Sequence, residues 1–345
     1  MLYPNVNIST EYQTVADAAG WAEIETGVLR VEGRDRVQWL HKLITADVEH
    51  LSVGESHEIM RRSDGTTEMD RIAYPRAKGT HAALLDAKGH FVADFILLVP
   101  NESILLLTDP TANESLYNTL RRYIIREKVQ LHDDSGKWTL FTFVGNQSDE
   151  FVQQLFGSRA PTTPFHFART PFADESAFLI RTARALLPSI DVLIPARARD
   201  ALRTALASVP YLTSQTLETL RVEAGIPRWG VDFDTTTLAL EIPNVLEVRV
   251  DQGCYVGQEV VARIVHRGHV NRHLLGLKFD GSECPARSDV IFHDGKEVGS
   301  ITSSAYSPRF GALGLGYVRR EVEPETVVYV GKNRQARIVN LPFQH

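Results

Sequence analysis

The sequence predicts an α+β protein that carries a separate all-β domain at its C-terminus. Short alternating apolar and polar runs, typical of strands, occur along all 345 residues, whereas helical periodicity is confined to the part before about residue 270. Beyond Arg272 only short strands at regular intervals remain, which is the pattern of a small β-barrel or sandwich. We therefore expect an α+β body over residues 20–265, with two interleaved lobes whose boundary stays open, and a β-barrel over residues 270–345.

The body begins with a short alternating strand over 27–31 and a helix over 34–45 whose apolar residues recur at helical spacing. Residues 81–108 are expected to form only strands and turns. An amphipathic helix follows, with Ile124 and Ile125 on its apolar side. The three prolines between Arg159 and Pro171 indicate a surface connection. The remaining elements expected in the body are strands at 138–144, 178–181 and 190–194, and helices at 151–156, 200–209 and 214–225.

The C-terminal domain shows six short strand patterns separated by turn residues. They cover residues 273–279, 290–293, 298–304, 313–318, 327–330 and 336–339.

Composition excludes several classes of protein. With 43% hydrophobic and 23% charged residues, the chain is an ordinary globular protein. Its longest apolar run, Phe95 to Pro100, is far shorter than the roughly 18–20 residues that span a bilayer, so no membrane contact is expected. The net charge of −6 offers no global attraction for nucleic acid, and no direct nucleic-acid contact is expected. The acidic start of the chain is unlike a secretory or mitochondrial leader, which predicts a cytoplasmic protein.

The most unusual stretch is Asp251-Gln-Gly-Cys-Tyr-Val-Gly-Gln-Glu259, whose two glycines indicate a tight loop. The residues that follow predict a helix from near Gly257 to a stop at Gly268, with a β-strand as the alternative. Cys254 would then precede a helix N-terminus, where exposed amides stabilise a thiolate and make it a better nucleophile or metal ligand. The alternative is a small cysteine that only fills the loop. Cys284, in a polar turn, is not expected to be functional.

Two carboxylates also stand out. Alternation along the strand after His90 places Asp94 on a face with the apolar residues Val92, Ile96 and Leu98, where a carboxylate needs a bound partner. It either binds a ligand or caps a neighbouring turn. Glu223 lies in the last turn of its helix, where a carboxylate opposes the helix dipole, although many such residues are simply solvated.

Other chemical motifs are absent from the sequence. It contains no GxGxxG, no P-loop and no HExxH motif, and its twelve histidines are scattered. The two cysteines are 30 residues apart, so neither a structural disulfide nor a metal site is expected.

The cysteine loop resembles the K-G-C-Y-x-G-Q-E…R signature of the YgfZ family of folate-binding proteins, relatives of the glycine-cleavage T-protein. The residues that match are Gly253, Cys254, Tyr255, Gly257, Gln258, Glu259 and Arg263. Gln252 stands where the family usually has Lys. Two further stretches support the resemblance: residues 221–227 are similar to the family's R-x-E-A-G-I-P, and residues 300–318 are similar to the T-protein barrel. Lys88 to Asp94 is similar to the T-protein strand K-G-G-x-x-x-D, whose aspartate lies beside the folate amine.

The resemblance implies a three-lobed ring with a central folate channel and tetrahydrofolate, or a one-carbon derivative, as cofactor. Asp94 and Glu223 would contact the pterin, and Asp94 and Cys254 would be the catalytic residues. The implied function is to assist assembly or repair of Fe–S proteins, including tRNA-modifying enzymes, with Fe–S client or assembly proteins as partners. The alternative is a folate-dependent aminomethyltransferase or demethylase of the T-protein type, whose chemistry needs no thiol. A third, weaker possibility is a binding module that uses the pocket only as a scaffold.

Overall fold

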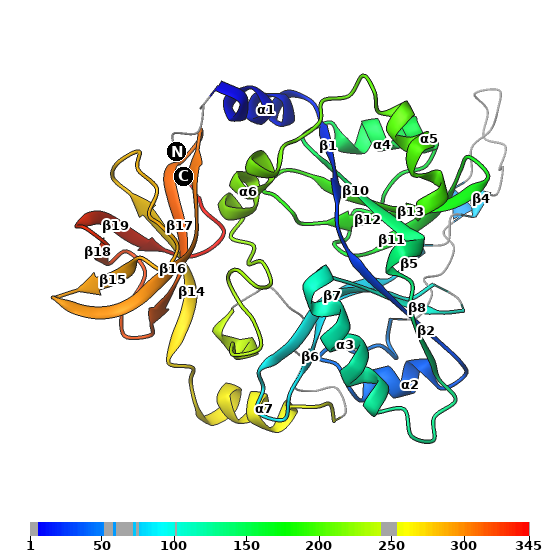
Figure 1. The fold of residues 1–345 in the computed structure, drawn as a ribbon, viewed down its shortest axis with the longest axis horizontal. Coiled ribbons are helices and arrows are strands. Elements are labelled where there is room, and N and C mark those ends of the chain that lie inside the picture. Colours follow the sequence, from blue (N-terminus) through cyan, green and yellow to red (C-terminus); the bar gives the residue numbers. More distant parts are fainter. Residues whose placement is uncertain are drawn as a thin grey trace.

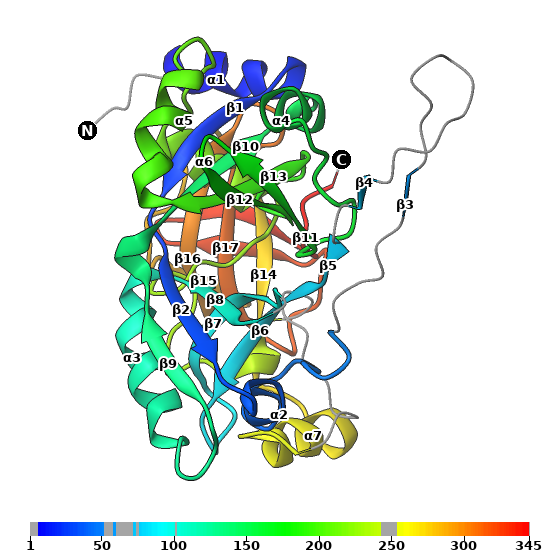
Figure 2. The same ribbon diagram turned by 90° about the vertical axis from the view of Figure 1, so that its right-hand side faces the viewer.

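The computed structural model describes residues 6–51, 58–59, 72–73, 76–100, 102–242 and 254–344. They form two antiparallel sheets, one above the other in Figure 1, and a closed barrel beside them. Viewed from the side, the barrel strands lie behind both sheets (Figure 2). The prediction of an α+β protein with a C-terminal β-barrel is therefore confirmed.

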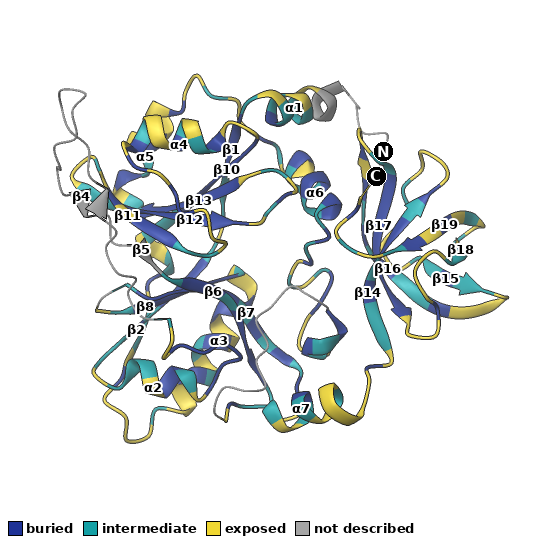
Figure 3. Cartoon of the chain, turned by 180° about the vertical axis from the view of Figure 1, so that it is seen from behind, coloured by how far each residue is buried: buried dark blue, intermediate teal, exposed yellow. Residues whose placement is uncertain are grey.

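The lower sheet in Figure 1 has the strand order β6-β7-β8-β2-β9. Its strands are β2 (Gly27–Glu32), β6 (Gly79–Leu85), β7 (Phe91–Leu98), β8 (Ile104–Thr108) and β9 (Gln130–Asp133). Helices α2 (Arg36–His41) and α3 (Pro110–Arg122) cover one face, where Trp39, Leu40 and Leu116 are buried in one apolar cluster with the strand residues. Its other face turns toward the upper sheet, and the strands of both sheets are largely buried (Figure 3).

The upper sheet has the order β1-β10-β13-β12-β11-β5. Its strands are β1 (Gly20–Ile24), β5 (Arg76–Ala77), β10 (Trp138–Val144), β11 (Phe167–Phe172), β12 (Glu175–Thr182) and β13 (Ser189–Pro195). Helices α4 (Ser148–Phe156) and α5 (Arg199–Ala205) pack on its outer face, around Phe141 and Phe143. Consecutive strands β1 and β2 belong to different sheets, so the chain passes from the upper to the lower sheet between them.

The barrel closes in the order β14-β17-β16-β15-β18-β19. Its strands are β14 (Arg272–Phe279), β15 (Val290–His293), β16 (Lys296–Ser307), β17 (Gly311–Arg319), β18 (Val327–Val330) and β19 (Arg334–Val339). Between the barrel and the sheets lie α1 (Val6–Asp17), α6 (Ser214–Glu223), the 3-10 turn η3 (Ala239–Glu241) and α7 (Gln258–Arg267) (Figure 1). A two-stranded ribbon, β3 (Glu58–Ile59) with β4 (Ile72–Ala73), and the turns η1 (Ser135–Lys137) and η2 (Ala196–Ala198) complete the described elements.

Three predicted helices are too long in the sequence analysis, and the one expected over 200–209 ends at Ala205 as α5. Helix α2 ends at His41 because the chain then runs beside β6: Ile44 bridges Leu84, and the Thr45 amide donates to the Ala83 carbonyl at 3.0 Å. The apolar residues after His41 are therefore buried by pairing with a strand. Helix α3 ends at Arg122, so Ile124 and Ile125 lie beyond it.

The surface connection predicted over 159–171 is wrong in its last part, which forms β11. Pro171 fits there because the outer neighbour, β5, pairs with β11 only at Phe167 and Ala168. The missing N–H of Pro171 therefore removes no bond to β5. The sequence analysis also missed α1, near the start of the chain, and β1 and β9, which are edge strands of the two sheets.

Candidate functional site

Asp94 lies on β7 and is paired with a histidine of the neighbouring strand. Along β7 the side chains of Val92, Asp94 and Ile96 are half-buried, whereas the alternate residues are buried under the helices. His81 Nε2 lies 2.9 Å from Asp94 Oδ2, and the two side chains are 17% and 18% exposed. The apolar face requires a partner for the Asp94 carboxylate, and among the described residues that partner is His81 rather than the backbone of a turn.

The Asp94 face of the lower sheet turns toward the upper sheet. Ile96, two residues along β7 from Asp94, packs into one apolar cluster with Ile180 and Leu193 of the upper sheet. The Phe165 ring lies 5.5 Å from the His81 ring, measured between centroids. The carboxylate therefore sits at the edge of a largely apolar inter-sheet region, with an aromatic ring beside its partner.

Glu223 ends α6 in a different part of the molecule. Its side chain is only 2% exposed, and Tyr12 Oη of α1 donates to Oε2 at 3.1 Å. Burial raises the pKa of the Glu223 carboxyl above its ordinary value. Oε1 is buried and, among the described residues, has no partner within hydrogen-bonding geometry, although the Ser307 hydroxyl is near enough to favour the charged carboxylate. Within the part of the chain that the structure describes, no contact joins Glu223 to Asp94.

The cysteine loop leads into a helix, as the sequence predicts. Helix α7 spans Gln258–Arg267 between Gly257 and Gly268, and the strand alternative for this stretch is wrong. The Cys254 side chain is exposed, so the alternative of a cysteine buried to fill the loop is wrong as well. Gly253 and Gln252 lie outside the described residues.

Several residues of the motif shape the turn before α7. Gln258 Oε1 accepts a hydrogen bond from the Tyr255 amide at 3.2 Å, which fixes the turn from inside the helix. The Tyr255 ring is buried in the apolar cluster between the lower sheet, α7 and the barrel. Burial raises the pKa of its hydroxyl to about 12, and among the residues that the structure describes the hydroxyl has no hydrogen-bond partner. Glu259 and Arg263 are exposed on the helix surface.

The turn between β6 and β7 connects the cysteine loop to the strand of Asp94. A Cβ atom built on Gly257 would lie 2.5 Å from the backbone oxygen of Asp86 in this turn. The other side of the turn is held by the Ala239 amide, which donates to the Gly89 oxygen at 3.1 Å. Asp94 lies four residues beyond His90, roughly 13 Å along the strand. Cys254 and Asp94 therefore flank one hairpin without direct contact in the described structure.

The sequence analysis missed two features of this region. The first is His81, which only the register of the β6–β7 hairpin brings to Asp94. The second is Asp191, fully buried on β13 and bonded by Arg184, whose Nη2 lies 2.6 Å from Asp191 Oδ2. A charged residue inside the apolar run 190–194 was the signal that could have revealed it, because the same pattern drew attention to Asp94.

Metal and membrane sites are not evident among the described residues. No three His, Cys, Asp or Glu side chains in these ranges are placed to share a metal ion. No helix there is long and apolar enough to cross a membrane.

Known proteins share this architecture. Residues 272–344 match the model of the glycine cleavage T-protein C-terminal barrel domain. The aminomethyltransferase of Rubrobacter xylanophilus is 26% identical over 345 residues, covering 97% of this chain and 86% of that protein. That of Geobacillus kaustophilus is 25% identical over 360 residues, covering 98% and 90%. The crystal structure of the glycine cleavage system aminomethyltransferase T from Bartonella henselae has a TM-score of 0.82 at 19% identity, covering 99% of this chain and 91% of that one.

The chain therefore has the T-protein fold and resembles aminomethyltransferases along nearly its whole length. The predicted fold class and the resemblance to the T-protein are confirmed. At the level of the family, these relatives favour the alternative function, a transferase of the T-protein type, over the Fe–S role. They carry no information specific to the YgfZ family.

Proposed function

We propose that this protein binds tetrahydrofolate in the central channel of the T-protein ring, beside the Asp94 edge of the inter-sheet region, and transfers a one-carbon unit to or from it. The observation that carries the proposal is the Asp94–His81 pair, held on an apolar inter-sheet face in a T-protein fold. The similarity to aminomethyltransferases over 97% of the chain supports the same chemistry.

The chemistry of this face suits a flat heterocycle that carries N–H groups. Val92 and Ile96 offer apolar contact on either side of Asp94, whose carboxylate accepts hydrogen bonds. Tetrahydrofolate supplies the carrier for the one-carbon unit, and Asp94 would hold its amine. His81 orients the carboxylate and can share or release a proton at Oδ2. Glu223, whose Oε1 has no partner within hydrogen-bonding geometry among the described residues, is the second proposed contact.

Replacing Asp94 with asparagine should weaken tetrahydrofolate binding by about 1.5–3 kcal/mol, roughly ten- to hundredfold in Kd. The reason is that the change keeps the shape of the side chain but removes the charge that strengthens its hydrogen bonds. Isothermal calorimetry with the purified protein measures the difference directly.

Asp174→Asn, in the exposed turn between β11 and β12, is the matched control and should bind as the unmodified protein does. Glu223→Gln tests the second contact in the same way. Unchanged affinity in both Asp94→Asn and Glu223→Gln would refute the proposed folate site.

A second candidate function rests on Cys254. Cys254 lies four residues before the first residue of α7, in a turn that the motif fixes, and its thiol is exposed. One-carbon transfer at Asp94 does not need this thiol. We therefore keep the proposal that the protein uses folate while assisting assembly or repair of Fe–S proteins, with Fe–S clients as partners. In this function Cys254 would be the reactive thiol.

Cys254 should react with iodoacetamide well before Cys284 as the pH is raised. Burial raises the pKa of the Cys284 thiol and also hinders the reagent, whereas Cys254 is exposed. Mass spectrometry of the two peptides across a pH series measures both rates. Equal rates at both cysteines would contradict this prediction.

Cys254→Ser then separates the two functions. If the protein transfers one-carbon units through Asp94 and needs no thiol, the variant keeps its folate binding and its transferase activity. Under the Fe–S function, it keeps folate binding but fails to restore Fe–S enzyme activity in a deletion strain, whereas Cys284→Ser restores it.

A further inference from the structure

The turn that follows α3 exposes an isoleucine almost completely. Ile125 is 80% exposed, whereas the next most exposed large apolar side chain in the described structure, that of Tyr211, is 53% exposed. Tyr123, two residues earlier, is also exposed. The sequence pattern predicts Ile125 on a buried helix face, so its exposure is a departure from the local pattern. Isolated apolar groups on a surface are ordinary, so the surroundings of Ile125 decide whether it marks a binding surface.

The turn is held in shape by its own acidic residue. Glu127 Oε2 accepts hydrogen bonds from the amides of Ile125 and Arg126, each at 3.0 Å. These amides hold the pKa of the Glu127 carboxyl below its ordinary value. The Glu127 carboxylate therefore bonds the backbone of its own turn, and the Ile125 side chain points into solvent.

Helix α2 and the loop before it anchor the same turn at both ends. Trp39 Nε1 donates to the Tyr123 carbonyl at 3.1 Å, and the Lys128 amide donates to Asp35 Oδ2 at 2.7 Å. A Cβ atom on Gly33 would lie 2.1 Å from the Lys128 oxygen, so the two backbones meet closely. Ile125 is therefore presented on a pre-organised turn and needs no ordering on contact, which lowers the entropic cost of binding.

The residues that flank Ile125 in the sequence carry mainly positive charge. Four exposed cations lie between residues 121 and 128, namely Arg121, Arg122, Arg126 and Lys128, against one acid, Glu127. The chain as a whole carries a net charge of −6, so this local charge is opposite in sign to that of the molecule. Such a patch attracts a negatively charged surface and repels a similar one.

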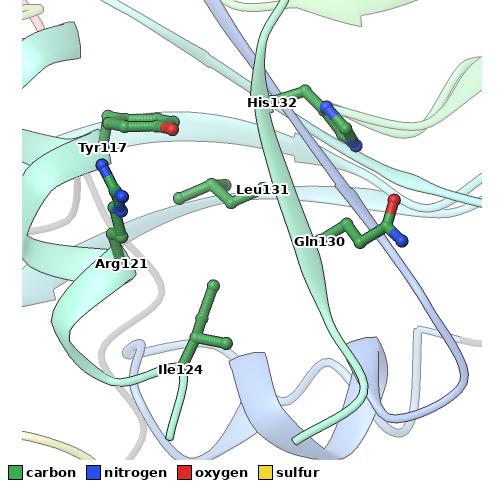
Figure 4. A pocket seen from close by; sticks show the side chains of 6 residues that line it. All are labelled: Tyr117, Arg121, Ile124, Gln130, Leu131 and His132. Carbon is green, nitrogen blue, oxygen red and sulfur yellow. The ribbon is translucent and has the colours of Figure 1, made fainter.

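A shallow cavity of about 410 Å³ lies beside the turn. Figure 4 shows Leu131 of β9 pointing toward Tyr117 and Arg121 of α3, with Ile124 below, whereas Gln130 and His132 point to the other side of the strand. The surface thus combines a projecting apolar side chain, a partly apolar hollow that Arg121 helps to line, and further exposed cations nearby in the sequence.

We propose that this surface, residues 117–132 around Ile125, docks a partner protein that presents carboxylates around an apolar side chain. Protein interfaces are enriched in aromatic residues and arginine, and a few anchors near their centre carry most of the binding energy. A second copy of this chain fits poorly because it would bring the same arginines together. An RNA backbone would match the arginines but would leave Ile125 without an apolar contact.

Photocrosslinking from position 125 identifies the partner protein that binds this surface. The full chain, produced in its own cells with a benzophenone amino acid at position 125, should crosslink to one protein with an acidic surface. The purified complex of the two should then weaken about tenfold or more with Ile125→Asp and with Arg122→Glu, and should weaken as salt is raised. Val265→Asp, an equally apolar-to-acidic change at an exposed position of α7, is the matched control and should not affect binding.

Folate affinity and thermal stability of the Ile125→Asp protein should match those of the unmodified protein, because the side chain is exposed. Three outcomes would overturn the proposal: crosslinks only to this chain or to RNA, no specific crosslink, or a complex that is indifferent to both substitutions.

Discussion

Replacing Arg221 with methionine is expected to destabilise the folded protein by about 3–5 kcal/mol, because it leaves a buried carboxylate without its counter-charge. Arg221 Nη1 lies 2.7 Å from Asp232 Oδ2, and the Asp232 side chain is completely buried. The guanidinium also bonds Glu218 of α6 and the Ser303 hydroxyl of the barrel strand β16. This network ties α6 to the barrel, so its loss should loosen both.

Urea unfolding of the purified variants measures the effect. The double variant Arg221→Met with Asp232→Asn should recover part of the loss, because the orphaned charge is then removed as well. A single variant Arg221→Met that loses less than about 1 kcal/mol would show that Asp232 is satisfied by Thr302, Ser303 and the Arg228 amide alone.

Local patterns in the sequence predict the parts of the fold that depend on neighbouring residues. Helix α7 follows from its apolar spacing and its flanking glycines, and the barrel strands follow from alternation and turn residues. The end of α2 does not follow, because it depends on pairing with β6, about 40 residues farther along the chain. Such a boundary is set by a pairing partner that is distant in the sequence, and the periodicity of the local sequence does not identify that partner.

The same distinction holds at the candidate site. The position of Asp94 on an apolar face is visible in the sequence, because a charged residue interrupts an otherwise apolar alternation. Its partner His81 is not visible, since the register of the hairpin decides which side chain meets it. Asp94 and Glu223 are each unusual in the sequence, but the sequence holds no measure of their separation. The structure places them on different elements, one facing the upper sheet and the other packed against α1.

Replacing Gly257 with alanine should cost about 2–5 kcal/mol and detach the cysteine loop from the β6–β7 turn. Gly257 has a φ of 84°, a conformation in which any Cβ is strained. The new Cβ would also lie 2.5 Å from the Asp86 oxygen, which belongs to backbone and cannot simply move aside. We expect faster amide hydrogen exchange at Gly89 and Ala239, whose hydrogen bonds hold the turn in place.

Two further variants separate the causes of this loss. Gly281→Ala, where the structure leaves open space and φ is not positive, should change stability by less than about 0.5 kcal/mol. Gly257→Asn keeps the clash with Asp86 but tolerates the left-handed backbone better than alanine does. If Asn and Ala destabilise equally, the contact with the hairpin dominates, and if Asn is much milder, the backbone strain dominates. A Gly257→Ala protein as stable as Gly281→Ala would mean that the loop carrying Cys254 does not depend on the hairpin that carries Asp94.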